Sequence, residues 1–67
     1  MDPHRTPAEI TALTLLDRDG IASIWQLHMA AADAYQTGHP AAAGAILEIA
    51  EAAEEAWLRA EGERVPV

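Results

Sequence analysis

A chain of 67 residues with a net charge of −7 and no cysteine is one small domain at most. The absence of cysteine excludes disulfides and thiolate metal sites. The acidic charge, with four arginines as the only basic residues besides histidine, disfavours binding to a phosphate backbone, which needs clustered Lys and Arg. A domain of this size buries only about 60% of the surface that its unfolded chain exposes. We therefore expect a second copy or a standing partner to stabilise it.

The first helix is predicted to begin after a short flexible tail, residues 1–5. Thr6-Pro7-Ala8-Glu9 has the form of a capping box, in which Thr6 accepts from the backbone N–H of Glu9. Proline suits the first helical position because its missing N–H has no partner there. The predicted helix covers residues 7–18.

Asp19-Gly20 is a turn signal and interrupts the helical pattern. The sequence leaves two alternatives open. The chain either breaks here and starts a second helix at about residue 21, or continues as one bent helix to Thr37. Ser23-Ile24-Trp25-Gln26 resembles another capping box, with Ser23 as the cap, and this favours the break.

The predicted second helix, residues 21–37, is apolar over about half of its circumference. Advancing 100° per residue brings Ile21, Ile24, Trp25, His28 and Tyr35 onto one side of it. This arc is wider than the stripe of a helix that packs on one neighbour. We therefore expect a central helix with neighbours on two sides.

Gly38 and Pro40 predict a tight connection to a third helix, residues 40–61, which Gly62 would end before a flexible tail at residues 63–67. A connection this short makes the two helices antiparallel neighbours. Pairing residues about the loop sets large side chains against small ones: Tyr35 near Ala42, Ala31 near Ile46, Ile24 near Ala53, and Ile21 near Trp57.

The third helix is predicted to have two different sides. Its main apolar stripe contains Ile46, Ile49, Ala50, Ala53, Trp57 and Ala60. Glutamates occupy the opposite side, and a minor apolar patch lies beside them. We expect these two groups to form a partner-binding surface: Leu47, Glu48, Glu51, Glu55 and Leu58.

His28 is the one histidine on a predicted helix that could carry chemistry. It is interpreted as a buried imidazole bonded to a backbone carbonyl or a carboxylate, or as a polar interface residue that fixes register. A metal ligand or a general base is the alternative. A buried position would make His28→Asp severely destabilising and His28→Leu tolerated.

No other pattern indicates catalysis. Glu48, Glu51 and Glu55 have helical spacing but no histidine joins them, so a solvated face is expected rather than a metal site. Ser23 lacks a nucleophile motif, and no glycine-rich phosphate loop is present. The stretch LTLLDRDGIASIWQLHM could be a helix-turn-helix, but its second helix begins without Arg or Lys to read DNA. We predict no catalytic residue, no metal ligand and no cofactor.

The sequence thus predicts an all-α protein: a helical hairpin with an N-terminal helix or extension, dimerising into a helical bundle. The predicted dimer interface contains Ile21, Ile24, Trp25, His28 and Trp57.

The predicted function is a small acidic, non-enzymatic protein that binds itself and a larger protein as a regulator, adaptor or accessory subunit. The alternatives are a DNA-associated regulator, and a small enzyme or metal carrier with a site between subunits. Neither a signal peptide nor a membrane span is evident, so we expect a cytoplasmic protein. Lysine, asparagine and phenylalanine, which have A/T-rich codons, are absent, and this suggests a GC-rich bacterial genome.

Overall fold

The computed structural model describes residues 5–64. Over this range it has three helices and no strand: α1 (Pro7–Asp19), α2 (Ala22–Gln36) and α3 (Pro40–Arg64). The all-α class predicted from the sequence is therefore confirmed. The tails predicted at both ends lie mostly outside the described residues. None of the helices in this range has an apolar stretch that could cross a membrane.

The start of α1 is fixed by Thr6, as the capping box predicts. Thr6 has an extended backbone conformation, and its hydroxyl oxygen accepts a hydrogen bond from the backbone N–H of Glu9 at 3.2 Å. The same hydroxyl donates to the Glu9 carboxylate at 3.3 Å. Pro7 occupies the first turn, where an N–H would have no partner. The first bond gives a partner to the backbone N–H of Glu9, one of the N–H groups that have no partner within the first turn of a helix.

The chain breaks between α1 and α2 at Gly20. Gly20 has φ 65° and ψ −152°, a conformation that is essentially restricted to glycine. Its N–H donates to the carbonyl of Leu16 at 2.8 Å, which closes α1. The prediction that Ser23 caps α2 is wrong. Ile21 occupies the cap position without a side-chain bond, and the buried hydroxyl of Ser23 donates to the Gly20 carbonyl at 2.7 Å.

The connection between α2 and α3 ends α2 with a left-handed glycine. Gly38 has φ 86°, the conformation expected of it from the sequence. The N–H of His39 donates to Ala34 at 2.8 Å and that of Gly38 to Tyr35 at 3.2 Å. This pair of bonds is the Schellman arrangement, which satisfies the last carbonyls of a helix. The hydroxyl of Thr37 donates to the carbonyl of Asp33 at 2.9 Å.

α3 begins at Pro40 as predicted, but it does not end at Gly62. The helix continues to Arg64, so residues 63 and 64 are helical and do not belong to a tail. A glycine inside a helix costs about 1 kcal/mol relative to alanine, which lowers helix stability without forcing an end. Gly62 does not adopt a positive φ, and the left-handed conformation that ends α2 is therefore absent here.

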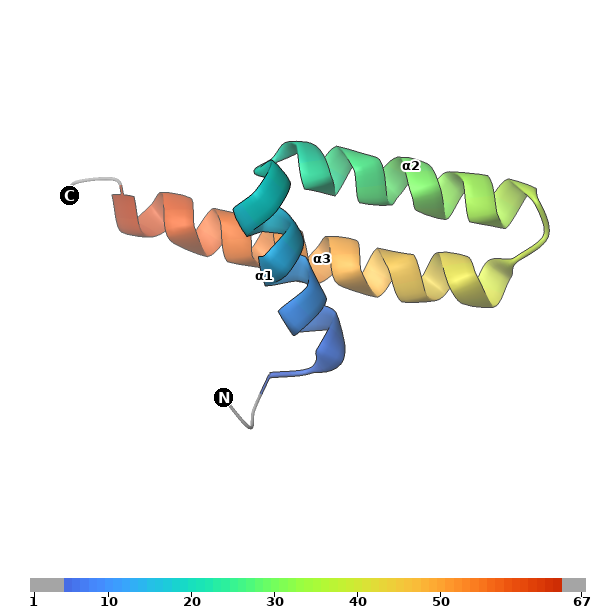
Figure 1. The fold of residues 1–67 in the computed structure, drawn as a ribbon, viewed down its shortest axis with the longest axis horizontal. Coiled ribbons are helices and arrows are strands. Elements are labelled where there is room, and N and C mark those ends of the chain that lie inside the picture. Colours follow the sequence, from blue (N-terminus) through green and yellow to red (C-terminus); the bar gives the residue numbers. More distant parts are fainter. Residues whose placement is uncertain (1–4, 65–67) are drawn as a thin grey trace.

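The central element of the fold is α3, not α2. α3 packs against α2 along one side and is crossed by α1 on another, whereas α1 and α2 meet over a short stretch near Gly20 (Figure 1). α2 and α3 lie side by side and run in opposite directions. The wide apolar arc of α2 had predicted a central helix with neighbours on two sides, but within the chain only α3 packs along much of α2.

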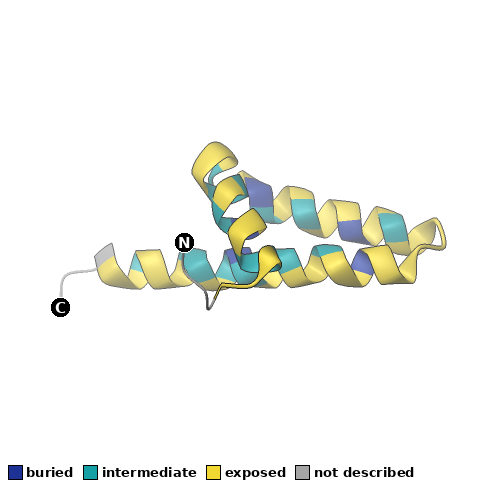
Figure 2. Ribbon diagram, turned by 60° about the horizontal axis from the view of Figure 1, so that its bottom comes forward, coloured by how far each residue is buried: buried dark blue, intermediate teal, exposed yellow. Residues whose placement is uncertain are grey.

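The interior between the helices is made of alanine. The fully buried apolar residues are Ala12, Ala31, Ala43, Ala50 and Ala53, and the only buried polar residue among those described is Ser23 (Figure 2). Side chains this small let helix backbones approach closely, since interaxial distance depends on the side chains at the contact. The larger side chains flank this seam: Ile24, Leu27, Ile46, Ile49 and Trp57 are half-buried.

This arrangement produces an elongated molecule. Its principal extents are 45 × 26 × 19 Å and its radius of gyration is 13.0 Å. A compact globule of the same length has a radius of gyration of about 11 Å. Two long helices with one short helix across them cannot enclose a central core, and most side chains therefore remain in contact with solvent (Figure 2).

We predict that Gly20→Ala destabilises the fold and that Gly44→Ala stabilises it. At Gly20 an alanine would be strained by about 1–3 kcal/mol because of the backbone conformation. Gly44 lies inside α3 with open space around an added methyl group, so alanine should raise the unfolding free energy by roughly 0.5–1 kcal/mol. Chemical denaturation followed by circular dichroism at one fixed protein concentration measures both. Equal effects of the two substitutions would contradict the assigned turn.

We predict that Ala53→Leu strongly destabilises the packing of the helices. Ala53 is completely buried, and a leucine there would force the helices apart at a cost of about 1–3 kcal/mol or more. Ala45→Leu is the matched control because Ala45 is exposed on the same helix, and its effect should stay within about 0.5 kcal/mol. The same denaturation measurement applies. An Ala53→Leu variant as stable as the control would show that the seam is not close-packed.

Candidate functional site

The outer side of α2 carries large apolar side chains in solvent. Trp25, Met29 and Tyr35 are 70%, 69% and 71% exposed, and Ile21 is also exposed. Single exposed apolar residues are normal on protein surfaces, but several large ones on one helix suggest an interaction site. Tryptophan and tyrosine are also the residues that most often anchor protein interfaces.

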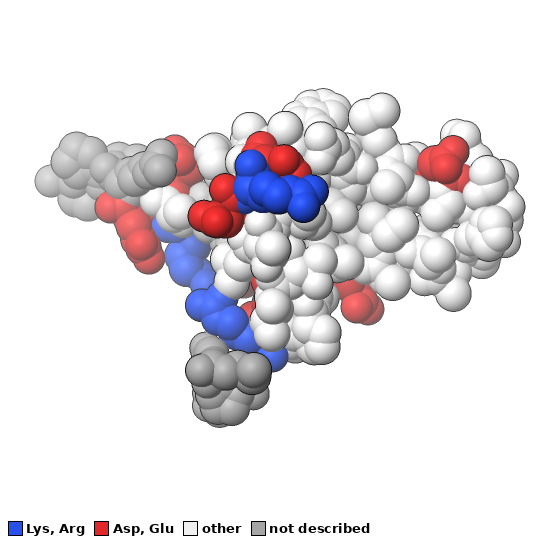
Figure 3. Space-filling model, in the orientation of Figure 1, with Lys and Arg blue, Asp and Glu red and all other residues white. Residues whose placement is uncertain are grey.

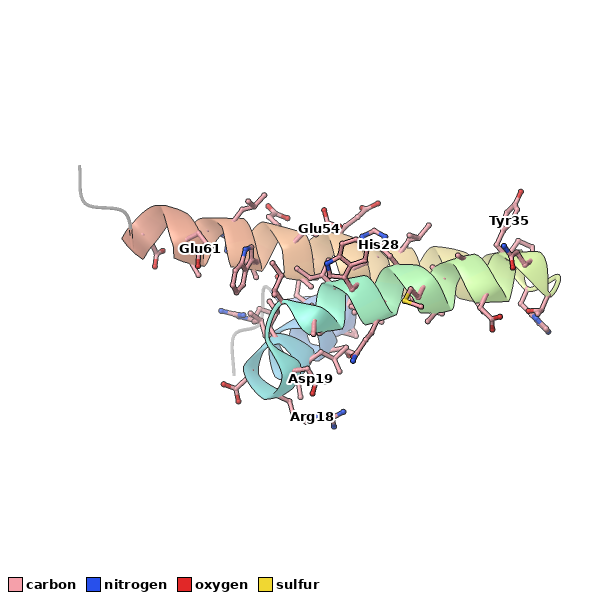
Figure 4. The ribbon with its side chains drawn as sticks, turned by 90° about the horizontal axis from the view of Figure 1, so that it is seen from above. Arg18, Asp19, His28, Tyr35, Glu54 and Glu61 are labelled. Atoms are coloured by element: carbon pink, nitrogen blue, oxygen red, sulfur yellow. The ribbon has the colours of Figure 1, made fainter. Side chains whose placement is uncertain are left out.

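His28 lies at the edge of this group and bonds to α3. Its Nε2 is 2.5 Å from Oε1 of Glu54, so the carboxylate accepts a hydrogen bond from the ring (Figure 4). Both side chains are 45% exposed. Of the partners considered for His28, a backbone carbonyl or a carboxylate, the structure has a carboxylate, but the prediction of burial is wrong. A half-solvated imidazole does not carry the desolvation cost expected for His28→Asp, because water still reaches a charge at this position.

The partner-binding residues predicted on α3 all lie at the surface. Glu48, Glu51 and Glu55 are exposed, and so are Leu47 and Leu58. Glu55 lies 3.5 Å from Arg59 one helical turn later, which makes it part of an exposed ion pair. Leu58 is 68% exposed, although leucine gains from burial. The surface therefore combines carboxylates with apolar side chains that have no cover in a single chain.

The exposed side of α2 and the leucines of α3 flank the His28–Glu54 pair. Figure 4 shows His28, Glu54 and Tyr35 on one side of the molecule. Arg18 and Asp19 of α1 lie on the opposite side. His28 and Glu54 bond across the two helices, and on each helix the side chains one turn away lie on the same face as this pair. Both helices thus contribute to a single surface.

The residues predicted for the dimer interface separate into two groups. Ile21, Trp25 and His28 are exposed on α2, whereas Ile24 and Trp57 are half-buried. The sequence indicated that one of the two tryptophans could be available to a partner. In the structure that residue is Trp25, and Trp57 is half enclosed.

A small cavity lies between α1 and α3. Its volume is about 50 Å³, and its lining mixes two arginines, two glutamates and small apolar groups: Arg5, Glu9, Leu13, Ala52, Glu55, Ala56 and Arg59. Ligand pockets are typically several hundred Å³, while one water takes about 30 Å³. The cavity therefore has room for one or two water molecules. Arginine side chains are visible at the α1 end of the molecule, with acidic side chains near them (Figure 3).

The charges are unevenly distributed along the molecule. Between residues 20 and 47 the only acidic or basic residue besides histidine is Asp33. The far half of α2 and α3 accordingly shows few charged side chains in Figure 3. Within residues 5–63, no group of three or more histidine and carboxylate side chains is placed so that it could hold a metal ion.

The sequence did not point to three residues of this surface. Glu54 was not paired with His28, and Met29 and Tyr35 were not proposed as interface residues. The helical projection already placed His28, Trp25 and Tyr35 on one side of the second helix. No comparable signal identifies the partner of His28, because the relative rotation of two helices depends on their packing.

We predict a weak coupling between His28 and Glu54 in the single chain. A double-mutant cycle with His28→Ala and Glu54→Ala should give about 0.2–1 kcal/mol, the range of exposed ion pairs. The cycle is measured by denaturation at a protein concentration low enough to keep the chain monomeric. Glu55→Ala with Arg59→Ala is the matched control and should give about 0.3–0.5 kcal/mol. A coupling of several kcal/mol would mean that the pair is buried.

Comparison with protein-family models found no match for this chain. Comparisons with curated proteins and with solved structures likewise found no similar protein. The surface formed by α2 and α3 is therefore the feature from which a function can be inferred.

Proposed function

We propose that this protein is a non-enzymatic α-helical binding protein that associates with itself and binds a larger protein. In this proposal, the hairpin of α2 and α3 is the structural unit, and two hairpins form a helical bundle. The observation that carries the proposal is the group of exposed apolar side chains on α2 and α3: Ile21, Trp25, Met29, Tyr35, Leu47 and Leu58.

The composition of the interior supports self-association. Its fully buried side chains are alanines and one serine, and alanine removes little apolar surface from water. Burying a large apolar side chain contributes about 1.5–3 kcal/mol. Covering a few of the exposed residues would add several kcal/mol to a domain whose own core supplies about 3–5 kcal/mol.

The acidic surface of α3 supports a protein partner with a basic surface. Glu48, Glu51 and Glu55 are exposed, and the chain has a net charge of −7. Charge complementarity of this kind accelerates encounter and selects partners more than it adds affinity. Leu47 and Leu58 lie beside these glutamates and would supply an apolar anchor to whichever molecule covers them.

Sedimentation equilibrium at micromolar concentration tests self-association. We expect a species heavier than the 7.2 kDa chain. A fully helical monomer would overturn this part of the proposal.

We further predict that the variant Glu48→Gln/Glu51→Gln/Glu55→Gln binds the protein partner more weakly and with less salt dependence. The partner is the protein recovered by pull-down from the native host, and affinity is measured at two salt concentrations. The control Asp17→Asn/Asp19→Asn/Asp33→Asn removes the same number of charges from exposed sites on α1 and α2. If both variants lose affinity equally, only the net charge matters and the proposed acidic surface is not the binding site.

A further inference from the structure

We propose that a second copy of this chain covers the surface around His28 and Glu54, and that these two residues form a central polar layer of the dimer. The inference rests on the self-association proposed above and assigns it a face, an orientation and a register. The outer row of α2 contains Ile21, Trp25, His28, Ala32 and Tyr35. The outer row of α3 contains Leu47, Glu51, Glu54, Leu58 and Glu61. Together these two rows are called the heptad face.

The spacing of both rows is that of helices that pack in bundles. In each row the residues follow one another in alternating steps of four and three, which is the heptad period. Rows of this period pack against another helix at about 20°, the crossing angle of four-helix bundles. The inner seam of alanines already takes one side of α2 and α3, so the heptad face is a second packing surface on the same two helices.

The His28–Glu54 bond fixes which residues of the two rows lie at the same height. α2 and α3 are antiparallel, so seven residues forward from His28 on α2 correspond to seven residues back from Glu54 on α3. Tyr35 therefore lies level with Leu47. In the other direction Trp25 lies level with Leu58, within about one residue rise of 1.5 Å. The polar pair is thus flanked by an apolar layer on each side.

The area of the heptad face suits a dimer of this size. Helix α2 is about 22 Å long, and two helices side by side are about 20 Å wide. A flat face of these dimensions covers about 440 Å², and the relief of its side chains brings the area closer to the roughly 800 Å² per partner that a standard interface buries. The two aromatic residues alone expose roughly 200–350 Å², given their exposed fractions and the area of an aromatic side chain.

Charge selects the orientation of the second copy. The α3 row contains Glu51, Glu54 and Glu61, whereas the α2 row contains no carboxylate. Placing α3 on α3 of the other copy would bring like charges together, which opposes association. A two-fold axis parallel to the helices instead places α2 of one copy over α3 of the other. His28 then faces Glu54 of the second copy as well as its own, and imidazole and carboxylate groups alternate around the polar layer.

This layer would fix the register of the dimer. If one copy slipped by a heptad, each His28–Glu54 pair would keep its own bond but would lie against Tyr35 with Leu47 or Trp25 with Leu58, and its remaining polar atoms would lose their contacts to the other copy. A buried polar group without a partner is strongly disfavoured, and polar core residues specify register in coiled coils for this reason. The second copy would cover Leu47, Leu58 and Glu51 of the heptad face, which leaves Glu48 and Glu55 on the neighbouring flank for the basic protein.

The face is tested by sedimentation equilibrium of Trp25→Glu and Tyr35→Glu. Each should weaken dimerisation about 30-fold or more, because a charge replaces an aromatic anchor of the interface. Both residues are largely exposed in the single chain, so helicity measured by circular dichroism should be retained. Ile10→Glu is the control, since Ile10 is an exposed apolar residue on α1, outside the heptad face, and its effect should be under threefold.

A wild-type monomer would overturn both this inference and self-association. A dimer unaffected by Trp25→Glu and Tyr35→Glu would overturn this inference alone.

The orientation is tested by cysteine cross-linking. The chain has no cysteine of its own, so Ala32→Cys and Glu51→Cys introduce single sites. An oxidised mixture of the two variants should yield a mixed dimer, because α2 of one copy lies over α3 of the other. Each variant alone should cross-link little, since its two sites lie diagonally across the bundle, beyond disulfide distance. Efficient cross-linking of Glu51→Cys with itself would overturn the orientation.

The polar layer is tested by exchanging its residues. His28→Glu gathers four carboxylates in one layer and should weaken dimerisation about tenfold or more. His28→Glu combined with Glu54→His restores the alternation of imidazole and carboxylate groups and should recover most of the dimer affinity. If the single substitution leaves the dissociation constant unchanged, the pair does not lie in the interface.

Discussion

The close approach of helices at an alanine seam is the constraint on which the rest of the structure depends. Ala50 and Ala53 of α3 are completely buried, and Ala31 and Ala43 nearly so. Helices that meet through such small side chains leave no room for large ones between them. Larger residues are therefore placed at the edges of the seam, and those on the outer side of α2 are largely exposed. The exposed apolar surface is a consequence of how closely the helices pack.

Most local features could be predicted from the sequence because they depend on neighbouring residues. The capping box at Thr6, the left-handed Gly38 and the start of α3 at Pro40 each follow from backbone geometry and hydrogen bonding within a few positions. Ser23 shows the limit of this approach. Its spacing from Gln26 suits a cap, but the Gly20 turn brings its hydroxyl to a carbonyl instead, inside the first turn of α2.

The tertiary features were less predictable, because apolar periodicity identifies which sides of a helix avoid water but not what covers them. The wide arc of α2 led to the prediction of neighbours on two sides, and within the chain only α3 covers much of it. His28 was expected inside that arc and is half exposed at its edge, beside Glu54. The residues proposed for the partner-binding surface are all exposed, which a helical projection alone could indicate because they lie opposite the buried stripe. Whether they bind a partner depends on a molecule outside the chain.

The different environments of the two tryptophans give the protein an intrinsic optical signal. Indole fluorescence shifts to shorter wavelength when water is removed from around the ring. Trp57 is already half enclosed by its own chain, whereas Trp25 is largely in water. Any molecule that settles on the outer side of α2 would change the emission of Trp25 far more than that of Trp57. Assembly of this protein could therefore be followed by its own emission spectrum, without an attached dye.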